Sequence, residues 1–156
     1  MKADRRQERE AAAARKAAMA TLDAAPADLL KQLWTEAAFA FDAHAVRGPE
    51  TGLVTLRGRI GGGGAPFNFG EATVTRATVR LSSGEVGHAY ALGRDTEKAR
   101  LSAIADAAWQ HREHRAAVEE KIVAPLREAA ASADARRRAE TAATKVDFFT
   151  MVRGED

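Results

Sequence analysis

The stretch GEATVTRATVRL, Gly70–Leu81, decides the fold. Side chains two residues apart share a face of a β-strand. The alternation therefore places one set on one face and the other set opposite: Thr75, Ala77, Val79 and Leu81 against Val74, Arg76, Thr78 and Arg80. We predict a strand over Glu71–Leu81 with an apolar face and a face that carries arginines.

Two further strands are predicted on either side of this stretch. Leu53–Ile60 alternates as well, with Val54, Leu56 and Ile60 on one face and Thr55, Arg57 and Arg59 on the other. The glycines of 61–64 and Pro66 then force a loop, and the turn at 82–84 leads into a strand over Val86–Leu92. Strands that follow one another through short connections pair antiparallel, so we expect a meander of at least three strands.

Helical periodicity surrounds the strands. The first strong pattern covers Pro26–Phe41 and stops before Gly48 and Pro49, which we interpret as breakers. Asp95 is placed to cap the next helix, and a further helical region is interrupted near Pro125. The expected fold class is α+β: a small antiparallel sheet packed with helices on one face, with helical N- and C-terminal regions.

The domain division follows from composition. Residues 1–21 are rich in charge and alanine, which predicts a helical or flexible N-terminal extension. Residues 22–156 form one predicted domain, and its last segment, 146–156, becomes abruptly apolar and aromatic. A chain of 156 residues is long enough for one core and too short for two.

Charge and cysteine content exclude several functions. The 24 Lys and Arg residues nearly balance the 22 Asp and Glu residues, and the signs are interleaved, which argues against nucleic acid as a partner. Without cysteine the chain has no thiolate for a metal or an iron–sulfur cluster. No run of about 18 apolar residues predicts a membrane span, and no secretory signal is recognisable. The expected location is the cytoplasm.

A glycine-rich loop beside arginines is the candidate substrate site. Glycine lets backbone N–H groups approach a phosphate, and arginine binds phosphate oxygens in a bidentate manner. The alternative is a flexible connection with solvated arginines, because no Walker signature follows. The candidate residues are Arg57, Arg59, Gly61, Gly62, Gly63, Gly64 and Arg76.

No catalytic or metal-binding set can be assigned from the sequence. His111 and His114 share a helix face, but no third ligand completes a metal site in an obvious way. We therefore predict no metal site and name no catalytic residue.

The apolar C-terminal segment is the candidate partner interface. Large apolar side chains left in water are unfavourable by roughly 1.5–3 kcal/mol each. They must either fold back onto the sheet or insert into another protein, and the sequence does not choose between these. The residues concerned are Phe148, Phe149, Met151, Val152 and Arg153.

Several blocks together resemble the PhnG family: residues 50–53 (ETGL), 59–62 (RIGG), 70–81 (GEATVTRATVRL), 93–95 (GRD) and 146–154 (VDFFTMVRG). The resemblance covers about residues 22–156 and implies a subunit of the bacterial carbon–phosphorus lyase core complex, which acts in phosphonate catabolism. That complex transfers a phosphonate to the ribose C1 of ATP and releases adenine.

The resemblance also implies the partners. They are the PhnI, PhnH and PhnJ subunits and ATPase-like accessory subunits, with the nucleosidase-like chemistry in PhnI and an iron–sulfur cluster in PhnJ. This chain would bind no cofactor of its own and would act as an assembly subunit of the PhnI-type partner within a transferase complex. The alternative is direct nucleotide or phosphonate binding through the glycine loop and its arginines.

Overall fold

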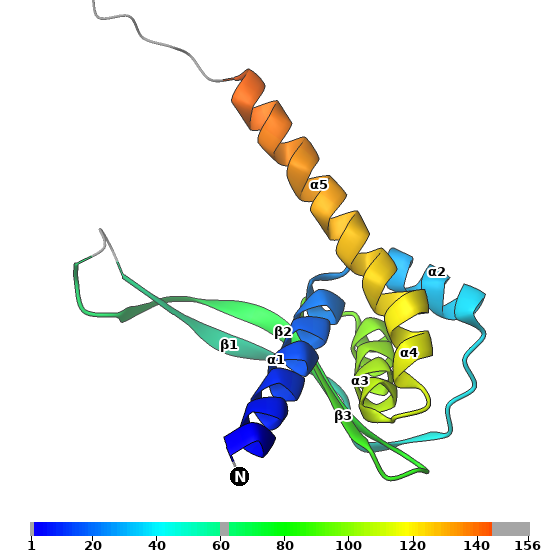
Figure 1. Ribbon diagram of the computed structural model, residues 1–156. Coiled ribbons are helices and arrows are strands. Elements are labelled where there is room, and N and C mark those ends of the chain that lie inside the picture. Colours follow the sequence, from blue (N-terminus) through cyan, green and yellow to red (C-terminus); the bar gives the residue numbers. More distant parts are fainter. Residues whose placement is uncertain (1, 60–62, 145–156) are drawn as a thin grey trace, which may run out of the picture.

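The computed structural model describes residues 2–59 and 63–144 (Figure 1). Its elements follow in the order α1 (Lys2–Ala24), α2 (Ala27–Ala37), β1 (Ala43–Gly58), β2 (Phe67–Leu81), β3 (Val86–Leu92), α3 (Thr96–Gln110), α4 (Arg115–Val118), the π-helical turn η1 (Glu119–Val123) and α5 (Ala124–Ala143). The α+β class and the helical terminal regions are confirmed.

The three strands form one antiparallel sheet in the order β1-β2-β3, which confirms the predicted meander. β3 has the predicted bounds, but β1 begins ten residues before the predicted start at Leu53. The helix ends before Gly48 and Pro49, as predicted, but these two residues lie within β1, where the β1–β2 ladder shifts register between Ala45 and Glu50. β1 is an edge strand, where a bulge accommodates a proline.

The inner face of the sheet packs against α3. Ala77, Val79 and Leu81 are buried there, as the alternation predicts, and α3 is buried on nearly every side. Its many alanines permit a close approach: a Cβ on Gly87 of β3 would lie 2.0 Å from the Ala103 carbonyl oxygen. The core therefore depends on small residues at this contact.

Larger side chains close the core from the remaining helices. Leu22 of α1, Leu30 of α2 and Leu126 of α5 are buried. α2 ends at Ala37, four residues before the predicted end at Phe41, because Ala38 adopts a left-handed conformation with φ 51°. The predicted cap of α3 is confirmed: the Asp95 side chain accepts the N–H of Lys98 at 2.8 Å.

A widened helical turn precedes Pro125. The N–H of Ala124 bonds to the Glu119 carbonyl, one residue further back than in an α-helix. Pro125, which has no N–H to donate, lies in the first turn of α5. α5 then continues away from the body of the molecule (Figure 1), and Leu126 is its one buried residue among those described.

Helix α1 crosses the predicted boundary at residue 21 without a break. Ala18 and Leu22 are buried in the core, and the Arg15 side chain reaches α3. Residues Arg5–Ala14 of the same helix are exposed. The C-terminal half of α1 therefore packs with the domain that follows it.

Candidate partner interface

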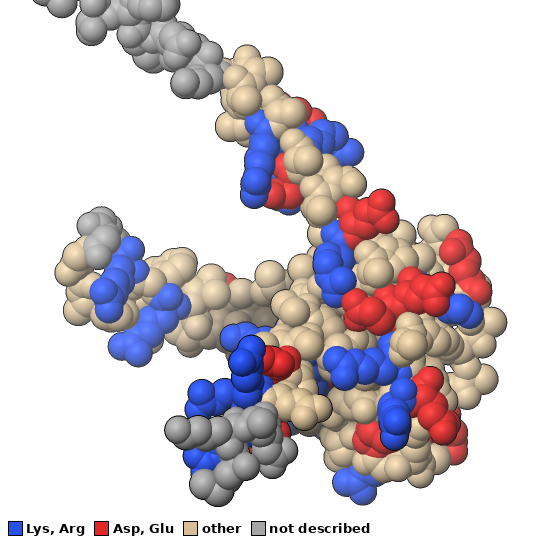
Figure 2. Space-filling view, viewed as in Figure 1, with Lys and Arg blue, Asp and Glu red and all other residues tan. Residues whose placement is uncertain are grey.

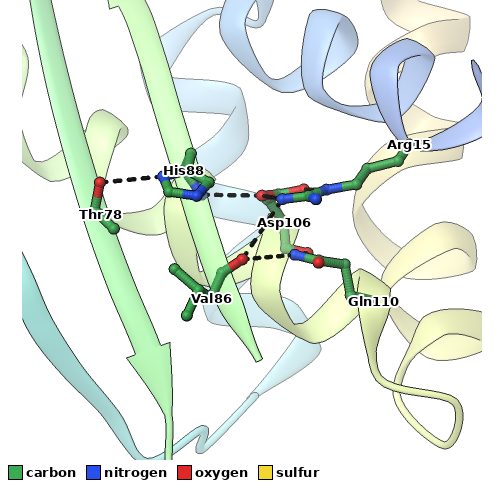
Figure 3. Close-up of polar contacts among 6 residues, drawn as sticks. All are labelled: Arg15, Thr78, Val86, His88, Asp106 and Gln110. Carbon is green, nitrogen blue, oxygen red and sulfur yellow. Dashed lines mark hydrogen bonds and ion pairs between the residues drawn. The ribbon is translucent and has the colours of Figure 1, made fainter. Parts of the chain in front are cut away.

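The sheet has two unlike edges, and side chains close the edge at β3 (Figure 3). The Asp106 carboxylate on α3 accepts the backbone N–H of His88 at 2.9 Å. The Val86 carbonyl accepts from Gln110 at 2.8 Å and from Arg15 at 3.5 Å. Exposed strand edges attract further strands, so these contacts satisfy backbone groups that would otherwise invite pairing.

Asp106 joins three elements at this edge. Arg15 of α1 donates Nε and Nη2 to its two carboxylate oxygens at 2.9 and 2.7 Å, in the bidentate geometry of strong charge-assisted bonds. Hydrogen bonding to Asp106 raises the pKa of Arg15. The Asp106 side chain is 1% exposed. These donors therefore replace the water that would otherwise stabilise the carboxylate.

A second carboxylate extends the closure. Asp23, near the end of α1, accepts the backbone N–H of Tyr90 at 3.4 Å, and burial raises the pKa of Asp23. Lys98 of α3 donates to the Asp23 carbonyl at 2.7 Å. α1 and α3 together therefore cover β3 from Val86 to Tyr90.

The edge at β1 differs. Within Glu50–Leu56 the ladder to β2 is regular, and among the described residues no side chain is hydrogen-bonded to the outer backbone groups of this segment. From Gly52 to Gly58 of β1, and from Phe67 to Thr73 of β2, the hairpin extends beyond the helices (Figure 1). We call these two segments the arm.

The arm exposes large apolar side chains. Phe69 is 59% exposed, Phe67 42%, Leu56 36% and Leu53 63%. The two phenylalanine rings contact edge to face with centroids 6.3 Å apart. Gly58 leaves room for them, because a Cβ there would lie 2.8 Å from the Phe69 ring. The arm therefore combines an ordered aromatic pair with access to solvent.

The predicted substrate-binding arginines do not lie together. Arg76 pairs with Glu50 at 2.6 Å at the base of the arm, and this bond lowers the pKa of Glu50. Arg57 lies seven residues further along β1, which corresponds to roughly 20 Å at the rise of a strand. Arg57 and Arg59 are exposed, as are Gly63 and Gly64. A shared site would need a ligand that spans this distance, so substrate binding by this set stays a prediction.

Several predicted residues lie outside the described part of the chain. These are Gly61 and Gly62 of the loop, together with Phe148, Phe149, Met151, Val152 and Arg153 of the C-terminal segment. Within residues 2–59 and 63–144, no group of three His, Cys, Asp or Glu side chains could hold a metal ion. His111 and His114 instead stack on each other with centroids 4.4 Å apart.

Sequence reasoning missed the arm as a surface. The predicted alternation placed Val54 and Leu56 on one face, and their register opposite Ala72 and Gly70 agrees with this. The pairing reveals that this face is continuous with Arg76 and Arg80, the face that none of the described helices covers. Pairing the predicted strands and comparing which residues share a face could have revealed this exposed apolar surface.

The fold and its surfaces define an α+β protein with a helix-covered sheet and a projecting two-stranded arm. The chain belongs to the PhnG family: the sequence model described as "Phosphonate metabolism protein PhnG" matches residues 13–154. A relative from Rhizobium meliloti (strain 1021), named alpha-D-ribose 1-methylphosphonate 5-triphosphate synthase subunit PhnG, is 65% identical over 115 residues. That match covers 71% of this chain and 70% of the relative.

Among the described helices none combines the length and the apolar character that crossing a membrane requires.

Proposed function

We propose that this chain is a subunit of the carbon–phosphorus lyase core complex in phosphonate catabolism and that it acts in assembly. The name of the relative, a synthase subunit, supports membership of a multi-subunit enzyme. In this role the chain supports the transfer of a phosphonate to ribose C1 of ATP with release of adenine. The bond-making residues then belong to a PhnI-type partner, and PhnH-type, PhnJ-type and ATPase-like subunits complete the assembly.

The observation that carries this proposal is the contrast between a closed body and an open arm. The core contains apolar residues from all the described helices and from β2 and β3, so the body is packed without the arm. The arm adds four large apolar side chains that stay exposed. Exposed apolar surface of this kind marks protein contacts, and interfaces are enriched in aromatic anchors.

Deletion of residues 146–156 tests the assembly role. We expect the shortened chain to fold with an unchanged Tm and to lose co-purification with the co-expressed PhnI-type subunit, because the apolar segment supplies anchors. A control with Phe148 and Phe149 replaced by Leu keeps apolar character and should still assemble. Full assembly of the deletion variant would contradict this role of the segment.

A second candidate function is direct binding of the nucleotide or phosphonate. The observation in its favour is that Arg57 and Arg59 are exposed near Gly63 and Gly64 and form no ion pair with the described residues. Replacement of Arg57 and Arg59 by Ala in the assembled complex should then raise KM for ATP or phosphonate. Reduced assembly with an unchanged KM would make the arginines structural.

A further inference from the structure

The polarity of the sheet reverses between its body and its arm. On β2 from Thr75 to Leu81, the inner face toward α3 is apolar and the outer face carries Arg76 and Arg80. On the arm the outer face becomes apolar, while the inner face carries mainly polar residues. The cross-strand register assigns to the outer face Gly52, Val54, Leu56 and Gly58 of β1 with Val74, Ala72, Gly70 and Phe67 of β2.

The buried side chain changes from the inner to the outer face between two neighbouring residues of β2, Thr75 and Val74. Thr75 is 1% exposed, and its hydroxyl donates to the Gly93 carbonyl at 2.8 Å on the inner face. Val74 is 4% exposed on the outer face. Side chains alternate between the faces of a strand, and the register shift opposite Leu56 and Arg57 brings Phe67 onto the outer face as well. The apolar residues of the arm therefore lie on the face that points away from α3.

The outer face of the arm is continuous with β3. Val74 pairs with Gly52 on one side and with Leu92 on the other, and Leu92 is 73% exposed. Phe69 belongs to the same face, because its ring lies where a Gly58 side chain would point. We call this surface, from Leu92 through Val54 and Leu56 to Phe67 and Phe69, the outer apolar face.

The exposed parts of Leu56, Phe67, Phe69 and Leu92 amount to roughly 400 Å² of apolar surface, which is within the range of the largest patches on monomeric proteins. A standard interface takes about 800 Å² from each partner, of which an apolar centre is one part. The outer apolar face is therefore large enough to be the centre of one stable contact.

The charged side chains near the outer apolar face indicate which residues a partner presents around the contact. Figure 2 shows Lys and Arg side chains at the far end of the arm. Arg57, opposite Asn68, lies on the inner face, and Arg59 follows the end of β1, so positive charge lies beside the outer apolar face and not within it. Glu71 is the one acidic residue in the described arm segments, Gly52–Gly58 and Phe67–Thr73. Because complementary charge guides and orients association, a partner should present Asp or Glu opposite the end of the arm.

We infer that the outer apolar face binds another subunit of the same assembly, through an apolar surface that is bordered by carboxylates. This inference rests on the proposed function and adds the face and the chemistry of the partner. Among the described helices, α3 packs against the inner face and α1 lies along the edge at β3, so the partner contacts the sheet from the side opposite α3.

Two substitutions on opposite faces of the arm test the inference in the full co-expressed complex. Phe69→Asp places a charge on the outer apolar face, and Thr55→Asp places the same charge one residue from Leu56 on the inner face. We expect Phe69→Asp to weaken subunit association at least tenfold and Thr55→Asp to leave it unchanged. Both free chains should keep the Tm of the original chain, because neither position belongs to the core.

Charge reversal gives an independent measurement. Arg59→Glu, just beyond the end of β1, should weaken association and reduce its dependence on salt, because screened attraction is lost. Unchanged association combined with a raised KM would overturn the inference in favour of substrate binding at the end of the arm.

Other outcomes are also distinguishable. Intact association of both Asp variants would overturn the inference, and the deletion of residues 146–156, measured in parallel, would show whether the assembly role still stands. A fall in Tm for Phe69→Asp alone would mean that the face is covered by the chain's own C-terminal segment. Retained association with a change from dimer to monomer of the isolated chain would assign the face to a second copy.

Discussion

The two halves of strand β2 meet opposite environments, and the ladder to β1 shifts register once in the outer half, between Gly70 and Asn68. From Thr75 to Leu81 the buried side chains point toward α3, whereas from Phe67 to Val74 the apolar side chains point away from it. The first half is part of a closed core, whereas Phe67–Glu71 of the second half remain open to solvent. Alternation therefore tells which residues share a face, and only the packing of other elements decides which face is buried.

The edges of the sheet repeat this contrast. β3 gives its outward backbone groups to Asp106, Arg15, Gln110 and Asp23, which come from α1 and α3. β1 has its bulges at the base, between Ala45 and Glu50, and a regular ladder in the arm as far as Leu56. The body is thus stabilised by its own contacts, and the arm is held chiefly by pairing between its two strands.

The largest expected difference between body and arm concerns Asp106. Asp106→Ala removes the acceptor of Arg15 and of the His88 N–H in a buried site, and the loss should be about 3–5 kcal/mol of unfolding free energy. Chemical denaturation followed by circular dichroism measures it. Asp134→Ala, which breaks an exposed pair with Arg138 on α5, is the control and should change stability by less than about 0.5 kcal/mol. Similar values for both variants would contradict a body that depends on this network.

Substitutions of glycine compare the body and the arm again, with smaller expected effects on stability. Gly87→Ala directs a methyl group at the Ala103 carbonyl and the Ala107 nitrogen, at 2.0 and 2.5 Å, so α3 must move away from β3. Overpacking of this kind lowers stability by about 1–3 kcal/mol.

Gly58→Ala in the arm meets the Phe69 ring, which can turn toward solvent. Its effect on Tm should be much smaller than that of Gly87→Ala, while association with a partner should fall because the aromatic pair is displaced. Equal losses of Tm at the two positions would mean that the arm is as tightly packed as the body.

Much of the fold was predictable because it depends on local signals. The alternation of β2, the turn before Val86 and the cap at Asp95 each act within a few residues, and each was confirmed. The start of β1 was not predictable in this way. Gly48 and Pro49 are strong local breakers, and a bulge on an edge strand, a feature of the whole sheet, accommodated them.

The candidate interface was harder to predict for a related reason. Val54 and Leu56 resemble core residues in the sequence, and their exposure follows from the position of α3 on the other face. The Asp106 network was missed as well, because Arg15 and Asp106 are 91 residues apart. Contacts over such distances leave no spacing that a single sequence reveals.

The smallest predicted effect is the pH dependence of the body at Asp95. Hydrogen bonding from Lys31, and then from the Lys98 N–H, lowers the pKa of Asp95 below its ordinary 3.8. A carboxylate with a lowered folded pKa adds stability above its ordinary pKa, and that stability is lost as pH falls through the lowered value. Asp95→Asn keeps a capping side chain and loses the charge. Its Tm should therefore lie below that of the original chain at neutral pH and converge with it in acid, as measured by thermal denaturation across pH.

The matched variant at the base of the arm is Glu50→Gln, because Arg76 lowers the pKa of Glu50 in the same direction. Glu50 joins Arg47 and Arg76 on the outer face, where no helix within residues 2–59 and 63–144 packs. If the body alone sets Tm, Glu50→Gln should leave the Tm profile across pH unchanged while Asp95→Asn alters it. A pH-dependent loss of equal size at both positions would show that the arm and the body unfold as one cooperative unit, and the division between them would then hold for surface chemistry but not for stability.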